Sequence, residues 1–139
     1  MNQTKATTQK DIVRKWHLLD AKGKVLGRLG VEIAHLLMGK GKAYFVRNLD
    51  CGDYVVVVNA KDVAVTGKKM TDKMYYRHSG YPSGLKGESL KDALQKNPRE
   101  VITHAVRGML PQNKLRASML KRLHVFPGEE HTYADKLAQ

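Results

Sequence analysis

The stretch from Val101 to His124 carries the side chains whose chemistry is easiest to interpret. It contains no Asp or Glu, and its cationic residues are Arg107, Lys114, Arg116, Lys121 and Arg122. Cations without neighbouring carboxylates are what a polyanion-binding surface requires, because they remain available to phosphate groups. We therefore interpret this stretch as a candidate nucleic-acid contact, with an ordinary solvated basic face as the alternative.

Further basic residues lie in segments that we expect to be loops. They occur beside glycine, serine or an aromatic ring, in three clusters: Lys40, Lys42 and Arg47; Lys68, Lys69 and Lys73; and Arg77, His78, Tyr81 and Lys86. Glycine lets a backbone approach phosphate closely, and Tyr or His can stack on an unpaired base. Arg28, on the polar face of a predicted helix, completes the candidate RNA-binding set. Each cluster alone is typical of a solvated surface, but loops at one end of an α/β sheet converge.

Catalytic and metal-binding chemistry is disfavoured by spacing. Residues 39–42, Gly-Lys-Gly-Lys, resemble a fragment of a phosphate loop, but they lack its spacing and follow a helix instead of a strand. Cys51 has no histidine fixed beside it by the sequence, as a cysteine nucleophile would need. The histidines are scattered, and a single cysteine offers no zinc site. We therefore expect no catalytic residue, metal, cofactor or small-molecule substrate.

The net charge indicates the class of partner. The chain has 139 residues and a formal net charge of +12, which implies nucleic acid or an anionic membrane surface. No apolar run approaches the roughly 20 residues that span a bilayer, and there is one Trp, so a membrane role is not expected. Cys51 is the sole cysteine, which excludes an intramolecular disulfide and fits a reducing compartment.

The elements that must position these cations follow from hydrophobic spacing. Four consecutive valines in 54–58 predict a strand covered on both faces, as in the centre of a parallel sheet. The other predicted elements are strands at 16–20, 63–65 and 74–77, helices at 26–38, 89–96, 98–109 and 115–123, a Gly/Pro loop at 79–87 and an extended exit at 124–126.

This order of elements predicts an α/β fold with a single domain. We expect residues 1–15 to be a flexible N-terminal tail, 16–128 the α/β RNA-binding domain and 129–139 a polar C-terminal tail. The first segment lacks the apolar centre of a secretory signal, and an organellar targeting role is a minor alternative for it.

Several motifs, in order, resemble one family. They are Trp16–Ala21 with Gly27–Leu29, Asp50–Ala60, Val65–Lys69, Tyr75–Gly80 and the hexapeptide Val106–Pro111. Together they are similar to the thirteenth large-subunit ribosomal protein family, of bacterial type, over about residues 16–131. Two positions depart from that family: Arg116-Ala117 stands where it usually has Gly then Arg, and Ser83 where a second loop glycine is common.

The resemblance implies a fold and a function. The fold would be a three-layer α/β/α sandwich around a small, mostly parallel sheet, with basic C-terminal helices. The function would be non-catalytic: to bind and organise large-subunit ribosomal RNA during assembly, beside neighbouring ribosomal proteins. The location would be the cytoplasmic ribosome, with an organellar ribosome still open. The alternatives are a free nucleic-acid-binding regulator and, more remotely, a nucleotide-using enzyme.

Overall fold

The four-valine run forms the centre of a parallel sheet. In the computed structural model, which describes residues 5–138, β2 (Tyr54–Val58) lies between β1 (Trp16–Asp20) and β5 (Leu123–Val125), with all pairings parallel. The three residues from Val55 to Val57 are completely buried. The prediction of a central strand is therefore confirmed, and so are the predicted bounds of β1.

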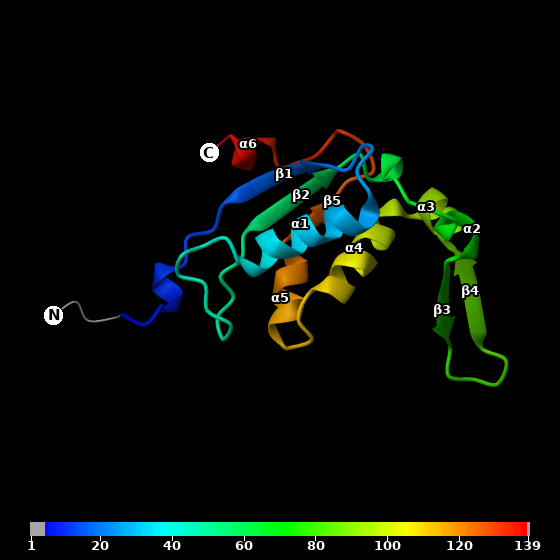
Figure 1. Cartoon of the computed structure of the whole chain (residues 1–139), viewed down its shortest axis with the longest axis horizontal. Helices are drawn as coiled ribbons and strands as arrows, with labels where there is room; N and C mark the ends of the chain where they lie inside the picture. Colours follow the sequence, from blue (N-terminus) through cyan, green and yellow to red (C-terminus); the bar gives the residue numbers. More distant parts are fainter. Residues whose placement is uncertain (1–4, 139) are drawn as a thin grey trace.

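Helices cover one face of this sheet. The helices α1 (Leu26–Met38) and α4 (Pro98–Met109) pack against each other and against the strands, while α5 (Leu115–Lys121) contacts both of them and β5 (Figure 1). Their buried side chains join Val55 and Val57 in one core. The predicted apolar faces of α1 and α4 are confirmed, except that Met109 at the end of α4 is 37% exposed.

The opposite face of the sheet is covered by aromatic rings and the C-terminal segment. Trp16 stacks on Tyr54 with ring centroids 4.4 Å apart and on Tyr133 at 5.1 Å, and the short α6 (Ala134–Leu137) contacts β1. The predicted polar C-terminal tail is attached to the body where it carries Tyr133 and α6, because the ring of Tyr133 stacks on Trp16 of β1. The result is an α/β fold with helices over one sheet face and partial cover over the other, where Leu18 remains 49% exposed.

A second, antiparallel sheet extends from the body as a hairpin. It consists of β3 (Met74–His78) and β4 (Leu85–Ser89) and projects beside α2 (Lys69–Asp72) and α3 (Leu90–Lys96) (Figure 1). The strand at 74–77 is confirmed, but the predicted loop at 79–87 is wrong after residue 84. The sequence of β4 lacks apolar alternation, so only its pairing with β3 defines it as a strand.

Other differences are local. The predicted strand at 63–65 is reduced to an isolated bridge between Val25 and Ala64, preceded by the 3-10 helix η2 (Ala60–Asp62). The last predicted helix ends at Lys121, and Leu123 belongs to β5, where it is buried in the core.

The predicted helix ends are largely confirmed. Ser89 caps α3 by accepting a hydrogen bond from the backbone N–H of Asp92 at 3.2 Å. Pro98 occupies the first turn of α4 after Asn97, although the Asn97 side chain makes no capping bond. Gly39 ends α1 with a left-handed φ of 74°, a backbone conformation that glycine adopts without steric cost.

The N-terminal segment is attached to the body where it is described. It contains the 3-10 helix η1 (Gln9–Asp11), and the hydroxyl of Thr7 donates to the carbonyl of Tyr44 at 3.2 Å. The expectation of a flexible tail also covers residues 1–4, which lie outside the described residues. Of the helices in residues 5–138, none is long and apolar enough to span a bilayer.

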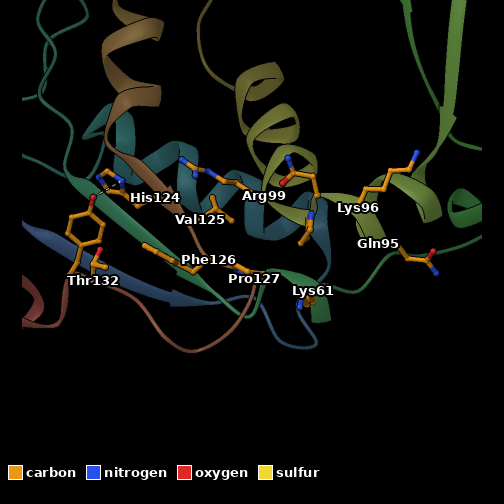
Figure 2. A pocket seen from close by; sticks show the side chains of 12 residues that line it. Lys61, Gln95, Lys96, Arg99, His124, Val125, Phe126, Pro127 and Thr132 are labelled. Atoms are coloured by element: carbon orange, nitrogen blue, oxygen red, sulfur yellow. Dashed lines mark hydrogen bonds between the residues drawn. The ribbon is translucent and has the colours of Figure 1, made fainter.

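The carboxyl ends of β2 and β5 open onto a cleft. It has a volume of about 570 Å³ and lies between the start of α4 and the C-terminal segment (Figure 2).

Candidate nucleic-acid interface

Most of the predicted RNA-binding side chains lie on the surface. The exposed members of the set are Arg28, Lys40, Arg47, Lys68, Lys69, Lys73, Arg77, His78, Tyr81, Lys86, Arg107, Lys114 and Lys121. Arg116 and Lys42 are half-buried, and Arg122 is buried.

The cations at the ends of α4 and α5 have no acidic partner. Arg107 lies in the last turn of α4, Lys114 immediately precedes α5 and Lys121 ends it. Within residues 5–138 none of these three side chains forms an ion pair. Their charge is therefore available to an external anion. We call Arg107, Lys114 and Lys121 the helical cation set.

The hairpin brings like charges together. Arg77 on β3 is directly opposite Lys86 on β4 in the strand register, an arrangement that is destabilising unless an anion neutralises it. Beyond them, Tyr81 in the connecting loop is 76% exposed, and Tyr76 on β3 is 67% exposed. Tyr76 was missed by the sequence interpretation, although its position next to Arg77 in a predicted strand could have indicated it.

The hairpin loop keeps an unusual backbone. Ser83 adopts a left-handed φ of 60°, a conformation that glycine takes more readily than other residues. The side chain of His78 accepts a hydrogen bond from the backbone N–H of Gly80 at 2.9 Å. The loop that carries Tyr81 therefore takes a glycine-type turn despite the serine.

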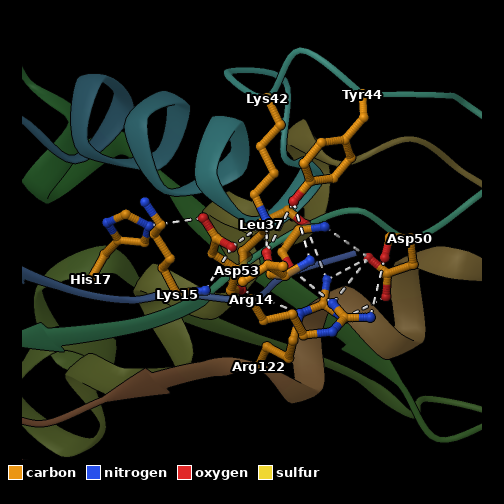
Figure 3. Close-up of polar contacts among 11 residues, drawn as sticks. Arg14, Lys15, His17, Leu37, Lys42, Tyr44, Asp50, Asp53 and Arg122 are labelled. Atoms are coloured by element: carbon orange, nitrogen blue, oxygen red, sulfur yellow. Dashed lines mark hydrogen bonds and ion pairs between the residues drawn. The ribbon is translucent and has the colours of Figure 1, made fainter. Parts of the chain in front are cut away.

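Arg122 is not a surface cation, which corrects its assignment as a phosphate contact. The whole residue is only 7% exposed. Its guanidinium binds both carboxylate oxygens of Asp50, with Nη2 2.5 Å from Oδ1 (Figure 3). The same group donates to the carbonyl oxygens of Asp53 and Leu37 at 3.2 and 3.1 Å. All of these partners belong to the protein, so Arg122 holds the fold together instead of facing RNA.

Lys42 is likewise engaged by the protein. Its ammonium lies 2.5 Å from Oδ1 of Asp53 and donates to the carbonyl of Val13 at 2.7 Å. His17 Nε2 lies 2.9 Å from the other carboxylate oxygen of Asp53 (Figure 3). The assignment of Lys42 as a phosphate contact is therefore also corrected. Its side chain is only 14% exposed, and Asp53 already compensates its charge.

The pKa of Asp53 reports this environment. Burial acts to raise it, but hydrogen bonds from Lys42, the backbone N–H of Lys15 and His17 outweigh burial and hold the pKa below its ordinary value. Asp53 is therefore a carboxylate that the fold keeps ionised.

Together, these contacts fix the loop between α1 and β2. Arg14 donates to the carbonyl oxygens of Gly52 and Asp50 at 2.7 and 3.1 Å. A Cβ on Gly52 would lie 1.6 Å from the carbonyl oxygen of Leu37, so the backbone needs glycine there. The network holds in place the loop that presents exposed Lys40 and Arg47. The pairing of Asp50 with Arg122 was not predicted from the sequence.

The structure describes the surroundings of the cysteine and of the candidate metal ligands. Cys51 is fully buried. Within residues 5–138, no group of three or more His, Cys, Asp or Glu side chains is placed to hold a metal ion.

Three of the segments that carry exposed cations extend in a common direction. Figure 1 shows the hairpin tip, the α4–α5 connection and the loop after α1 all on the side of the molecule opposite α6. The two ends of this side are the hairpin and the loop that contains Arg47.

The chain is similar to proteins of one family. Residues 14–132 match the family model described as ribosomal protein L13. A large ribosomal subunit protein uL13 from Dehalococcoides mccartyi is 54% identical over 129 residues, covering 93% of this chain and 90% of the relative. The uL13 of Clostridioides difficile is 56% identical over 124 residues, which cover 89% of this chain and 87% of the relative. The uL13 of Helicobacter hepaticus is 50% identical over 139 residues, which cover 100% of this chain and 98% of the relative.

Proposed function

This chain belongs to the ribosomal protein L13 family, and from this premise we propose that it is a structural constituent of the large ribosomal subunit. It binds and organises large-subunit ribosomal RNA during assembly, and it is not an enzyme. The observation that carries the proposal is the match of nearly the whole chain to proteins of that name. The unpaired surface cations supply its physical basis.

The binding mechanism is electrostatic and geometric. Lysine and arginine side chains replace the counterions of RNA phosphates, and the entropy of the released ions favours binding. The sheet and its helices hold the helical cation set, the loop after α1 and the hairpin at fixed separations. The protein can therefore fix the relative positions of several RNA segments, which is what a structural constituent must do.

Within the helical part of the surface, Lys114 and Lys121 are the strongest candidates for phosphate contacts. Both are exposed and without an ion pair in the described residues, whereas Arg116 is half-buried. The backbone N–H of Arg116 donates to the backbone carbonyl oxygen and to the side-chain oxygen of Asn113. At Arg116-Ala117, where the sequence departs from the family, the exposed charges are therefore those of Lys114 and Lys121.

The location and protein partners are part of the same proposal. The matched relatives come from bacteria, which supports a cytoplasmic ribosome and neighbouring ribosomal proteins as partners. The proposal involves no membrane and no small-molecule substrate.

Sedimentation tests the proposal. After a high-salt wash, the protein should migrate with large subunits, because a structural constituent is held by many contacts. A free regulator of messenger RNA would remain at the top of the gradient, and that result would overturn the proposal. The variant Lys114→Gln with Lys121→Gln should incorporate less efficiently than the charge-matched control Lys10→Gln with Lys22→Gln.

A further inference from the structure

The cleft at the carboxyl ends of β2 and β5 is separate from the surface described above. α5 leads into the amino end of β5, whereas this cleft is lined by the later residues of β5, His124 and Val125, and by Phe126 and Pro127 after it. Ligands of open α/β sheets bind outside the carboxyl ends of the strands. None of the predicted RNA-binding residues lines the cleft.

The cleft is cationic. Lys61, in η2 after β2, and Arg99, in the first turn of α4, approach it from different elements, and both side chains are exposed (Figure 2). No Asp or Glu is among its lining residues. Lys96 also lines it but pairs with Glu88 at 2.6 Å, whereas Lys61 and Arg99 form no ion pair within residues 5–138.

The floor of the cleft supplies aromatic rings. Phe126 is half-buried, with its ring centroid 6.1 Å from that of Tyr133. The Tyr133 hydroxyl lies 3.3 Å from Nδ1 of His124 (Figure 2). Burial, then the charges of Arg99 and Lys136, lower the pKa of His124. The cleft therefore combines uncharged rings with two cations.

We propose that this cleft binds one nucleotide of a single-stranded RNA segment, with Arg99 and Lys61 on its phosphate and Phe126 against its base. Cations combined with a stacking ring are how proteins hold unpaired nucleotides. A free nucleotide is disfavoured because the cleft lacks a glycine-rich loop to enclose its phosphates. The inference rests on the proposed function for the identity of the RNA, and it adds a second contact away from the helical cation set.

Directed cleavage locates the RNA. Thr132, exposed at the cleft, is changed to Cys and labelled with an iron chelate that generates hydroxyl radicals; the only native cysteine, Cys51, is buried. In reconstituted large subunits, the label at residue 132 should cut discrete ribosomal RNA nucleotides. Ala117→Cys provides the reference position, because residue 117 is exposed on α5. Cleavage from residue 117 but not from residue 132 would overturn the proposed RNA contact at the cleft and leave the proposed function standing. Cleavage from neither residue would count against the cleft contact and against the proposed function.

Salt titration measures the contact energetically. Arg99→Gln with Lys61→Gln should reduce the slope of log affinity for large-subunit ribosomal RNA against log salt by about one unit. Lys10→Gln with Lys22→Gln, which removes the same charge elsewhere, should change it less. An equal slope for the two double variants would overturn the proposal. Saturable binding of AMP to the wild type, lost in the cleft variant, would also overturn it by assigning the cleft to a free nucleotide.

Discussion

Adjacent basic residues at the end of α5 have different roles. Lys121 is exposed and unpaired within the described residues, whereas Arg122 is buried and binds Asp50 through two guanidinium nitrogens. Both look alike in the sequence. The difference arises because the chain turns from helix to strand between them, which directs Arg122 under the loop that precedes β2.

Replacing each of these residues by alanine should separate stability from RNA binding. Arg122→Ala should lower the free energy of unfolding by about 3 kcal/mol, because the half-buried carboxylate of Asp50 loses its bidentate partner and keeps only Arg14, 3.9 Å away. Lys121→Ala should change the free energy of unfolding by less than about 0.5 kcal/mol, and should reduce the salt slope of RNA binding by about one unit. Urea denaturation and RNA titration measure the two effects.

A stable Arg122→Ala protein with weakened RNA binding would show that Arg122 contacts RNA after all. Arg122→Met provides the control: it keeps most of the side-chain volume but removes the charge, so it should destabilise the fold through Asp50 as well.

The carboxylate of Asp53 predicts how stability depends on pH. Its pKa is lower in the folded protein than in the unfolded chain. Its stabilisation is therefore complete above the unfolded pKa and is lost as the pH falls through the folded value. Between pH 7 and strongly acidic pH, the free energy of unfolding should decline less in Asp53→Asn than in the wild type. Parallel declines in urea-denaturation series would contradict this assignment.

At the scale of elements, the hairpin is the part of the fold that depends least on the core. Most of its side chains are exposed on both faces, and an isolated two-stranded hairpin is marginally stable in water. It is anchored at its base, where the backbone N–H of Leu90 donates to the carbonyl of Lys73. We therefore interpret the hairpin as an arm whose tip is stabilised by the RNA.

Shortening this arm should affect binding more than folding. Replacing residues 79–84 by Asn-Gly would join His78 to Leu85, which are paired in the register, through a favoured two-residue turn. The melting temperature should stay within about 4 °C of the wild type, the shift expected for roughly 1 kcal/mol in a domain of this size. RNA affinity should fall, because Tyr81 is removed. Filter binding and thermal denaturation measure these quantities, and unchanged affinity would contradict an RNA-contacting tip.

The elements that sequence predicts well are those with strong local signals. The valine run specified β2, and apolar spacing together with Gly39 specified α1 from its first to its last turn. β4 was missed because its residues carry no apolar alternation and its partner strand alone defines it. The attachment of the C-terminal segment could not be predicted because one ring, Tyr133, fixes it by stacking on Trp16, more than a hundred residues earlier.

At the scale of the whole molecule, exposure could be predicted for most cations but their partners could not. Thirteen of the sixteen predicted site residues are exposed, because lysine and arginine rarely lose water without a partner. Arg122 and Lys42 are exceptions because carboxylates from other segments compensate their charges: Asp50 lies 72 positions before Arg122, and Asp53 follows Lys42 after a loop. Ion pairs between segments leave no periodic signal.

We propose that a non-catalytic body presents the helical cation set and the hairpin to ribosomal RNA from one side and holds a further RNA segment at the cleft. Lysine acetylation, mapped by mass spectrometry in the free protein and in assembled large subunits, tests this most directly. Lys114, Lys121 and Lys86 should react in the free protein and be protected in the subunit, while Lys42 should react poorly in both. If Lys114 and Lys121 react equally in both states, the RNA binds elsewhere and the account is wrong.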